Sequence, residues 1–220
     1  AAARAENLSI HVANVADRAR IEALVDEVID GFGAIDGVIN NAGIIQPFVP
    51  LLELEYSDIS RVLDVNLMGT IHVLKAFLPR LLERPTAHVV NVSSMGAFLP
   101  VPGQALYGAS KAAVKLMTEG IASELQDTNV GVTVIFPGAI NTNISQNSGV
   151  EMTANVDADA AAARTTPADA AARTILDAIQ RGAFRATVGR DAWFLDLYSR
   201  VAPRGSARFI KKQMKGMIPE

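Results

Sequence analysis

The sequence of 220 residues contains no cysteine and only three histidines. Without cysteine the protein can form no disulfide, and it has neither a thiolate nucleophile nor thiolate metal ligands. The histidines, His11, His72 and His88, are scattered along the chain, so we expect no metal site. The lack of disulfides permits a reducing compartment, and we expect a cytoplasmic location.

Long hydrophobic runs and a large excess of one charge are also missing. No apolar run approaches the roughly 20 residues that a membrane-crossing helix needs, and residues 1–15 lack the pattern of a secretory signal. The net charge of −3 provides no basic field that would attract nucleic acid. We therefore expect no transmembrane segment and no nucleic-acid partner. The 50% of apolar residues suits one domain over residues 1–220.

Helical and strand patterns alternate along the chain. The first helical pattern runs from Asp17, a capping residue, to Gly33. Further helices are expected over about 57–83, 107–125 and 167–181. Short apolar runs typical of buried strands occupy 35–39, 87–92, 131–136 and about 186–188. This alternation predicts an α/β protein with a parallel sheet and helices on both faces.

Two segments depart from this alternation. Residues 145–166 form an Ala- and Asp-rich connection, either a lid-like substrate loop or a surface insertion with a short alanine helix. The tail from about 191 to 220 contains the single Trp193 and has a basic amphipathic end, which we expect to be a solvated helix face. This tail could cover a cleft, bind a neighbouring subunit or touch a membrane. We favour packing against the body or a partner.

Small and polar residues follow three of the predicted strands. Asn40–Gly43 follows the first, Ser93 and Ser94 follow the second, and Pro137–Thr142 follows the third. In open parallel sheets ligands bind outside the carboxyl ends of the strands, so these segments are expected to face one crevice. Small residues let a flat ligand approach the backbone, while amides and hydroxyls orient it.

The motif "YGASK" places Tyr107 one helical turn before Lys111, on the helix that follows the serines. Such pairs are common on helix surfaces, and tyrosine is often a half-buried core residue. A phenol titrates near pH ~10, and a neighbouring ammonium favours its ionised form. Lys111 could thus make Tyr107 a usable base, with Ser94 holding the substrate oxygen.

On these residues the chain resembles the short-chain dehydrogenase/reductase family over nearly its whole length. The shared motifs are "NNAG" at Asn40–Gly43, Asn66 in "DVNLMGT", Ser94, "YGASK" and "PGAINT" at Pro137–Thr142. The interval between Ser94 and Tyr107 is usual for the family and selects Ser94 over Ser93. The resemblance implies a Rossmann-like doubly wound parallel sheet.

The resemblance also implies an NAD- or NADP-dependent oxidoreductase that interconverts a secondary alcohol and a ketone or aldehyde. By this resemblance Tyr107 exchanges the proton, Ser94 orients the substrate oxygen, and Lys111 lowers the tyrosine pKa and holds the nicotinamide ribose. Asn66 would support a proton relay, although an asparagine on a helix often bonds only to its own backbone. The implied cofactor-binding residues are Asn14, Val15, Asn40, Asn41, Ala42, Gly43, Tyr107, Lys111, Pro137, Gly138, Ile140 and Thr142.

Two features depart from the family pattern. Asn14 stands where the family usually has an acidic residue. The family's opening strand, glycine-rich phosphate loop, next helix and second strand are missing, so we expect a longer natural protein. The "GFGAIDG" stretch at 31–37 is no substitute, because it follows a helix and precedes a strand. Residues 8–12 would then be an edge strand separated from the rest of the sheet, and NAD cannot be distinguished from NADP.

Substrate class, assembly and alternative functions complete the predictions. Apolar residues follow the crevice segments, and no arginine clamp is evident, so we expect a neutral or apolar alcohol or carbonyl substrate; these residues are Ile45, Phe48, Phe98, Leu99, Val101 and Ile144. The resemblance implies a homodimer or homotetramer. Two alternatives remain: a non-catalytic nucleotide-binding or regulatory protein on the same scaffold, and the related epimerase/dehydratase branch.

Overall fold

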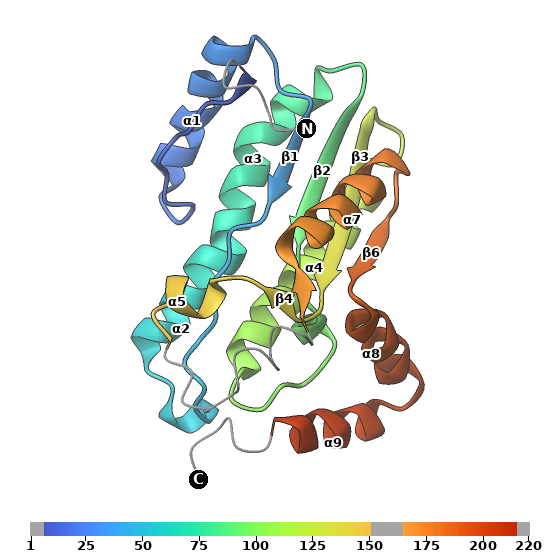
Figure 1. The fold of residues 1–220 in the computed structure, drawn as a ribbon. Helices are drawn as coiled ribbons and strands as arrows, with labels where there is room; N and C mark the ends of the chain where they lie inside the picture. The colour runs from blue at the N-terminus through green and yellow to red at the C-terminus, as the bar shows by residue number, and fades with distance from the viewer. Residues whose placement is uncertain (1–6, 151–164, 215–220) are drawn as a thin grey trace.

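The computed structural model describes residues 7–150 and 165–214, and its centre is a parallel sheet (Figure 1). The sheet has the order β1-β2-β3-β6, formed by β1 (Gly37–Asn40), β2 (Ala87–Val92), β3 (Val130–Pro137) and β6 (Arg185–Val188). Asn40 lies opposite Asn91, and Val92 lies opposite Ile135. The predicted parallel α/β sheet is confirmed, and the carboxyl ends of its strands lie at one edge.

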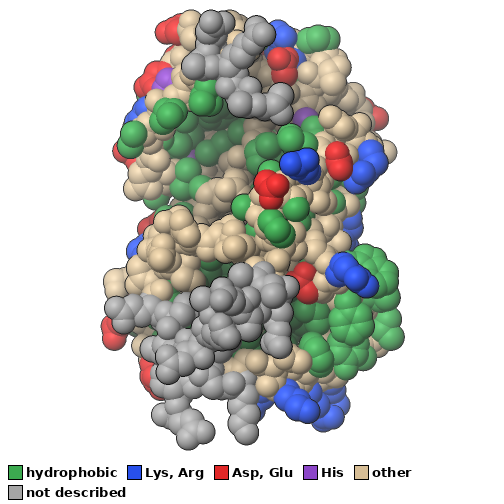
Figure 2. Space-filling model, in the orientation of Figure 1, with side chains coloured by type: hydrophobic (Ala, Val, Ile, Leu, Met, Phe, Trp, Pro, Cys, Tyr) green, Lys and Arg blue, Asp and Glu red, His purple; other side chains and the backbone are tan. Residues whose placement is uncertain are grey.

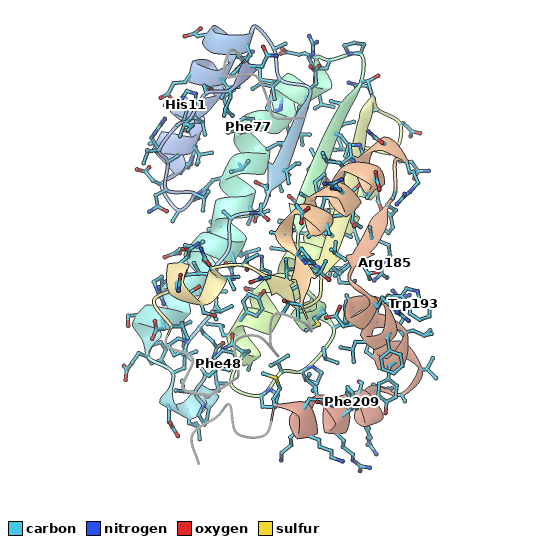
Figure 3. The ribbon with its side chains drawn as sticks, viewed as in Figure 1. His11, Phe48, Phe77, Arg185, Trp193 and Phe209 are labelled. Carbon is cyan, nitrogen blue, oxygen red and sulfur yellow. The ribbon has the colours of Figure 1, made fainter. Side chains whose placement is uncertain are left out.

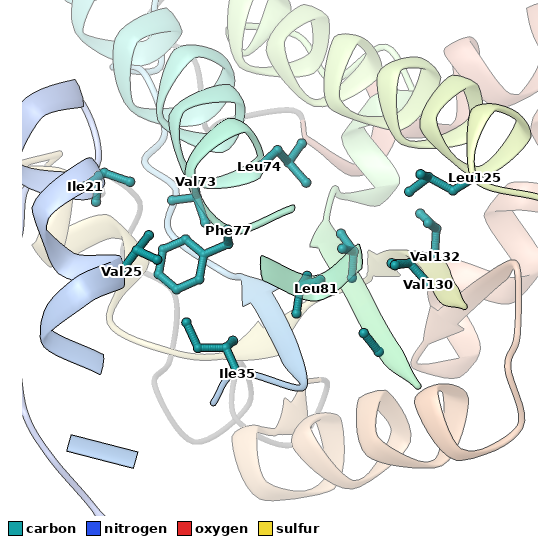
Figure 4. Close-up of a cluster of buried hydrophobic side chains, with 12 residues drawn as sticks. Ile21, Val25, Ile35, Val73, Leu74, Phe77, Leu81, Leu125, Val130 and Val132 are labelled. Atoms are coloured by element: carbon teal, nitrogen blue, oxygen red, sulfur yellow. The ribbon is translucent and has the colours of Figure 1, made fainter. Parts of the chain in front are cut away.

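Helices cover both faces of this sheet. One face is covered by α1 (Arg18–Phe32), α3 (Gly69–Leu82) and α4 (Ala105–Glu124). Figure 4 shows the apolar cluster on this face, in which Phe77 and Leu81 of α3 lie between α1 and the strands. The other face is covered by α7 (Ala168–Gln180). Val89 and Val90 of β2 belong to opposite clusters because successive strand residues point to opposite faces.

The predicted long helix is interrupted by a π-helical turn. It consists of α2 (Tyr56–Leu63), the π turn Asp64–Met68, and α3. These three elements form one helix, Tyr56–Leu82, which is the one described helix long and apolar enough to cross a membrane by length and composition. The sequence prediction of no transmembrane segment did not anticipate this helix. Core helices meet the same criteria, and α3 places Val73, Phe77 and Leu81 in the core.

The ends of α1 follow the sequence prediction. The Asp17 side chain accepts a hydrogen bond from the backbone N–H of Arg20, and Gly33 ends the helix with φ of 77°. A left-handed backbone conformation at this position favours glycine, because glycine lacks a Cβ. Gly33 is therefore a helix-stop residue, and "GFGAIDG" connects α1 to β1 in the helix-to-strand order that a phosphate loop does not have.

The prediction of a strand over residues 8–12 is wrong. Leu8, Ile10 and Val12 are 60%, 86% and 90% exposed, and the segment pairs with no strand among the described residues. A strand requires a partner for its backbone groups, and in the described part of the chain β1 pairs only with β2. The Arg20 side chain instead donates to the Val12 carbonyl at 3.0 Å, holding this segment against α1.

The elements that directly follow β3 are short. A second small sheet pairs β4 (Ile140–Asn141) with β5 (Thr166–Pro167), and α5 (Ile144–Asn147) follows β4. Two further single turns lie at Leu51–Glu53 and Met95–Ala97. Most of the predicted 145–166 loop, at 151–164, lies outside the described residues.

The predicted helical tail packs against the body, as we favoured from the sequence. It forms α8 (Arg190–Val201) and α9 (Pro203–Gln213), and Leu195 and Ile210 form a small core with Leu99. Trp193 lies on the outer side of α8 (Figure 3) and is 62% exposed. Figure 2 shows green apolar side chains over α8, bordered below by blue Lys and Arg side chains of α9.

Candidate active site

The carboxyl ends of β1 and β2 are joined by buried amides. The Nδ2 of Asn40 donates to Oδ1 of Asn91 at 2.7 Å, and Nδ2 of Asn91 donates to Oγ1 of Thr118 on α4 at 2.9 Å. The Asn40 side chain thus connects the two strands and α4. Of the residues that follow it, Asn41 and Ala42 are exposed and available to a ligand.

Gly43 lies directly against two of the predicted catalytic residues. A Cβ at this position would lie 3.0 Å from Lys111 Nζ and 3.4 Å from Asn66 Oδ1. These distances are at or below ordinary van der Waals contact, so glycine lets the backbone approach α4 and the π turn closely. The structure therefore brings the "NNAG" segment, Asn66 and Lys111 together.

Asn66 lies in the π turn and is fully buried. Its Oδ1 accepts from the Ile44 backbone N at 2.8 Å, and its Nδ2 donates to the Ile44 carbonyl at 2.9 Å and to Ser110 Oγ at 3.0 Å. Asn66 therefore bonds to another segment and to α4 rather than to its own backbone. Such π turns occur frequently at functional sites. The π turn thus directs the Asn66 side-chain amide toward Ile44, the residue that follows "NNAG".

Lys111 is buried beneath the carboxyl end of β2. Its Nζ donates to the Val92 carbonyl at 3.0 Å, and Lys111 as a whole is 4% exposed. Burial disfavours the charged ammonium and lowers the pKa of Lys111 to about 8. An ammonium has three N–H donors, so two donors remain beyond the bond to Val92.

Ser94 and Tyr107 meet at the start of α4. The Ser94 Oγ accepts from the Gly96 backbone N at 3.0 Å, and it lies 3.4 Å from the position of a Cβ at Gly96. A Cβ at Gly96 would lie 3.3 Å from the Tyr107 ring, and one at Gly108 would lie 3.0 Å from the Gly96 carbonyl. Two glycines thus allow the turn after β2 to pack closely on α4.

Ser93 has a different environment from Ser94. Its Oγ donates to the Lys111 carbonyl at 2.7 Å, and the residue is 2% exposed. This bond fixes α4 against the end of β2 and directs the Ser93 hydroxyl away from Tyr107. The structure therefore places only Ser94, of the two serines, beside the phenol.

One electrostatic expectation is wrong in this structure. Burial raises the pKa of Tyr107 above its ordinary value of 10, and the neighbouring Ser94 side chain offsets this rise only in part. The predicted lowering by Lys111 does not appear, because the cost of desolvating the phenolate dominates. Tyr107 is therefore a protonated donor at neutral pH.

The "PGAINT" segment is held by β6 and α8. Gly138 N donates to the Val188 carbonyl at 2.9 Å, and Ala139 N donates to Oδ2 of Asp191 at 2.7 Å. Pro137 ends β3, and Ile140 is half-buried while Thr142 is exposed. Asp191 was not foreseen from the sequence, because its partner is about 50 residues away and no local pattern marks it.

Asn14 and Val15 lie at the junction of α1 and α3. The exposed Asn14 accepts a hydrogen bond from Ala16 N at 3.0 Å. The Val15 carbonyl is 3.1 Å from Nδ1 of His72, and the Val15 side chain packs against Gly69 at the start of α3. Their described contacts are thus with α1 and α3, near the π turn but separate from the Ser94–Tyr107 contact.

Sequence reasoning missed a buried glutamine that contacts the backbone of Tyr107. Gln46 is fully buried, and its Oε1 accepts from the backbone N–H groups of Leu106 and Tyr107, each at 2.9 Å. A single glutamine in an irregular segment carries no periodic or motif signal, so this contact could not be found without the structure.

Comparison with known proteins now identifies the family. The family model described as short chain dehydrogenase matches residues 1–153. The chain belongs to the short-chain dehydrogenase family. Its members are NAD(P)-dependent oxidoreductases, so the chain is an enzyme of that class.

Individual relatives of this short-chain dehydrogenase agree with the assignment. The putative oxidoreductase SadH of Mycobacterium tuberculosis is 32% identical over 213 residues, covering 94% of the chain and 76% of SadH. A short chain dehydrogenase from Burkholderia cenocepacia in complex with NADP matches with a TM-score of 0.74 and 25% identity, over 90% of this chain and 76% of that one. An NAD⁺-bound xylitol dehydrogenase matches with a TM-score of 0.59 and 30% identity, over 70% and 62% of the two chains.

Proposed function

We propose that this short-chain dehydrogenase interconverts a secondary alcohol and a ketone or aldehyde, with Tyr107 as the proton donor and acceptor. The observation that carries the proposal is that the Ser94 hydroxyl and the Tyr107 ring both lie beside Gly96, within 3.4 Å of a Cβ placed there, one turn from Lys111. A hydroxyl and a phenol that share one small region can both reach the same substrate oxygen.

The residues present fit a nicotinamide dinucleotide. Lys111 keeps two N–H donors that are suited to ribose hydroxyls, and Gly43 gives the close backbone approach that a flat cofactor needs. Asn41, Ala42 and the exposed Thr142 would line the same cleft. The nicotinamide supplies or accepts the hydride when bound. The related solved structures hold NADP in one case and NAD⁺ in another, and we propose NAD or NADP for this chain.

The chain's own groups handle the proton. In the reducing direction the Tyr107 hydroxyl donates its proton to the carbonyl oxygen, while Ser94 orients that oxygen. The raised pKa of Tyr107 keeps the proton in place at neutral pH, as the reducing direction requires. In the oxidising direction Tyr107 must first be ionised to accept the alcohol proton, so we expect the oxidation rate to increase with pH.

The residues around the crevice support a neutral or apolar substrate. Of the six apolar residues that the sequence suggested, Leu99 and Ile45 belong to the core, at 1% and 8% exposure. Phe98 packs on the Phe136 ring with centroids 5.6 Å apart. The other three are half-buried and could still contact substrate; they are Phe48, Val101 and Ile144.

Nicotinamide absorbance, followed with the full-length protein over a panel of neutral ketones and secondary alcohols, tests the proposal. We expect turnover with at least one apolar member of the panel. Nucleotide binding without turnover would contradict the proposal and support the non-catalytic alternative. Turnover that persists unchanged in Tyr107→Phe would also contradict it.

A further inference from the structure

Gln46 uses both ends of its side-chain amide at the start of α4. Its Oε1 accepts from the backbone N–H groups of Leu106 and Tyr107, and its Nε2 donates to the Gly103 carbonyl at 2.9 Å. The side chain is fully buried, so these bonds replace solvent contacts that the amide cannot make. All three partners belong to the first turn of α4 or to the residue before its N-cap.

This arrangement is a helix cap supplied from a distant part of the sequence. The first N–H groups of a helix have no partner within the helix, and the N-cap side chain usually accepts from one of them. The N-cap of α4 is Gln104, whose side chain makes no capping bond. Gln46 therefore performs this function for Leu106 and for Tyr107.

Gln104 completes the connection in the opposite direction. Its Nε2 donates to the Gln46 carbonyl at 2.8 Å, so the backbone of Gln46 is bonded to α4 as well as its side chain. The Gln104 Oε1 is buried without a hydrogen-bond partner. An unpaired buried acceptor costs free energy. The same Gln104 amide group makes the bond that joins residue 46 to α4.

The connection places one short stretch against three residues of the candidate site. The Gly43 backbone lies beside Lys111, Ile44 is held by Asn66, and Gln46 holds the backbone of Tyr107. A shift of residue 46 would therefore move the start of α4 relative to the segment expected to line the cofactor cleft. Misplacement by about 1 Å can reduce a catalysed rate about 100-fold.

We propose that Gln46 is a positioning residue, which fixes the Tyr107 phenol relative to the cofactor cleft by capping α4. This inference rests on the proposed function of Tyr107. Gln46 does not touch the reacting atoms and acts through the backbone of the helix that carries the phenol.

Two variants of the full-length protein test this role. Gln46→Met keeps the length of the side chain but removes its donor and acceptors, and we expect kcat to decrease about 10- to 100-fold with little change in the KM for nucleotide. Gln46→Glu keeps two oxygen acceptors for the α4 N–H groups, so it should retain more activity than Gln46→Met. Gln180→Met, at an exposed position on α7, is the matched control and should behave as wild type.

The pH profile distinguishes positioning from a general effect on the fold. The carboxylate of Gln46→Glu would lie against the backbone N–H groups of Leu106 and Tyr107, at the start of the helix that carries the phenol. Its negative charge disfavours the phenolate, so the rise of the oxidation rate should move to higher pH. A merely structural role would leave this profile unchanged. If Gln46→Met does not fold, the Gln46→Glu profile decides, and an unshifted profile contradicts the inference.

The outcomes separate this inference from the function on which it rests. A wild-type protein that turns over no alcohol or ketone overturns the proposed function and the inference together. A wild-type protein that is active, with a folded Gln46→Met variant of equal kcat, overturns the inference alone. Reduced kcat in Gln46→Met with partial recovery and an alkaline shift in Gln46→Glu supports both.

Discussion

The two ends of the parallel sheet are built from different chemistry. At the carboxyl end, buried polar side chains are joined by hydrogen bonds; Gln46, Asn66, Asn91 and Lys111 are all less than 5% exposed. At the opposite end, Leu81, Leu125 and Val130 form an apolar cluster. Burying polar groups costs free energy unless each is paired, whereas burying apolar groups stabilises the fold directly. The carboxyl end thus fixes positions, and the opposite end supplies stability.

The largest effect is expected from Tyr107→Phe, which changes the carboxyl end alone. Removing the hydroxyl eliminates the proton donor but keeps the ring that packs on Gly96, so kcat should decrease about 1,000-fold while the unfolding free energy changes little. Steady-state kinetics and thermal unfolding measure the two effects. The matched control is Tyr56→Phe, because Tyr56 is 85% exposed at the start of α2. Equal loss of activity in both variants would contradict this prediction.

Leu81→Ala makes the opposite change, at the apolar end. Leu81 has no exposed surface, and its truncation leaves a cavity, so we expect the unfolding free energy to decrease by about 2–5 kcal/mol. Activity per folded molecule should remain near the wild-type value. Denaturant unfolding monitored with Leu82→Ala as control measures the effect, since Leu82 is the next residue of α3 and is 42% exposed. A large loss of specific activity in folded Leu81→Ala would mean that the two ends are not independent.

The sequence predicts the apolar end better than the carboxyl end. Periodic apolar residues identified α1, α3, α4, α7 and all four strands of the main sheet, because helical and strand spacing report which side of an element is buried. The motif around Tyr107 and Lys111 identified where polar residues gather. Neither signal reaches the bonds from Gln46 to α4 or from Asp191 to Ala139, which join residues about 50 to 60 positions apart.

Two failures of prediction have the same physical origin. The direction of the Tyr107 pKa depends on how much protein surrounds the phenol, and a sequence shows the nearby lysine but not the burial. Residues 8–12 have the apolar composition of a strand, yet strand formation depends on a partner beside them. In both cases the decisive quantity is set by the environment in three dimensions.

A smaller effect is expected from the buried charge of Lys111. Because its pKa falls from 10.5 to about 8 on folding, the unfolded chain binds more protons between these values. Stability should therefore rise with pH in this range and be lost again as pH falls toward 8. We expect the unfolding free energy of the wild type to gain about 2 kcal/mol over that of Lys111→Met between about pH 7 and about pH 9.5.

Denaturant titrations of both proteins at several pH values measure this difference. Lys212→Met is the matched control, because Lys212 is exposed on α9 and its ammonium keeps contact with water. If the difference in unfolding free energy between wild type and Lys111→Met does not change with pH, the Lys111 ammonium is not desolvated in the fold.

The smallest effect is expected from the cap at the start of α1, compared with the cap at the start of α4. The α1 helix is capped by its own Asp17, whereas α4 is capped by Gln46 from another segment. Asp17→Ala should decrease the unfolding free energy by about 1 kcal/mol, the usual contribution of a local cap, and Asp17→Asn should restore most of it. Neither variant should change kcat, since the Asp17 side chain bonds only to the first turn of α1 among the described residues. A kcat that decreased in Asp17→Ala as it should in Gln46→Met would show that any weakened cap disturbs the site, and that the remote origin of the α4 cap has no special consequence.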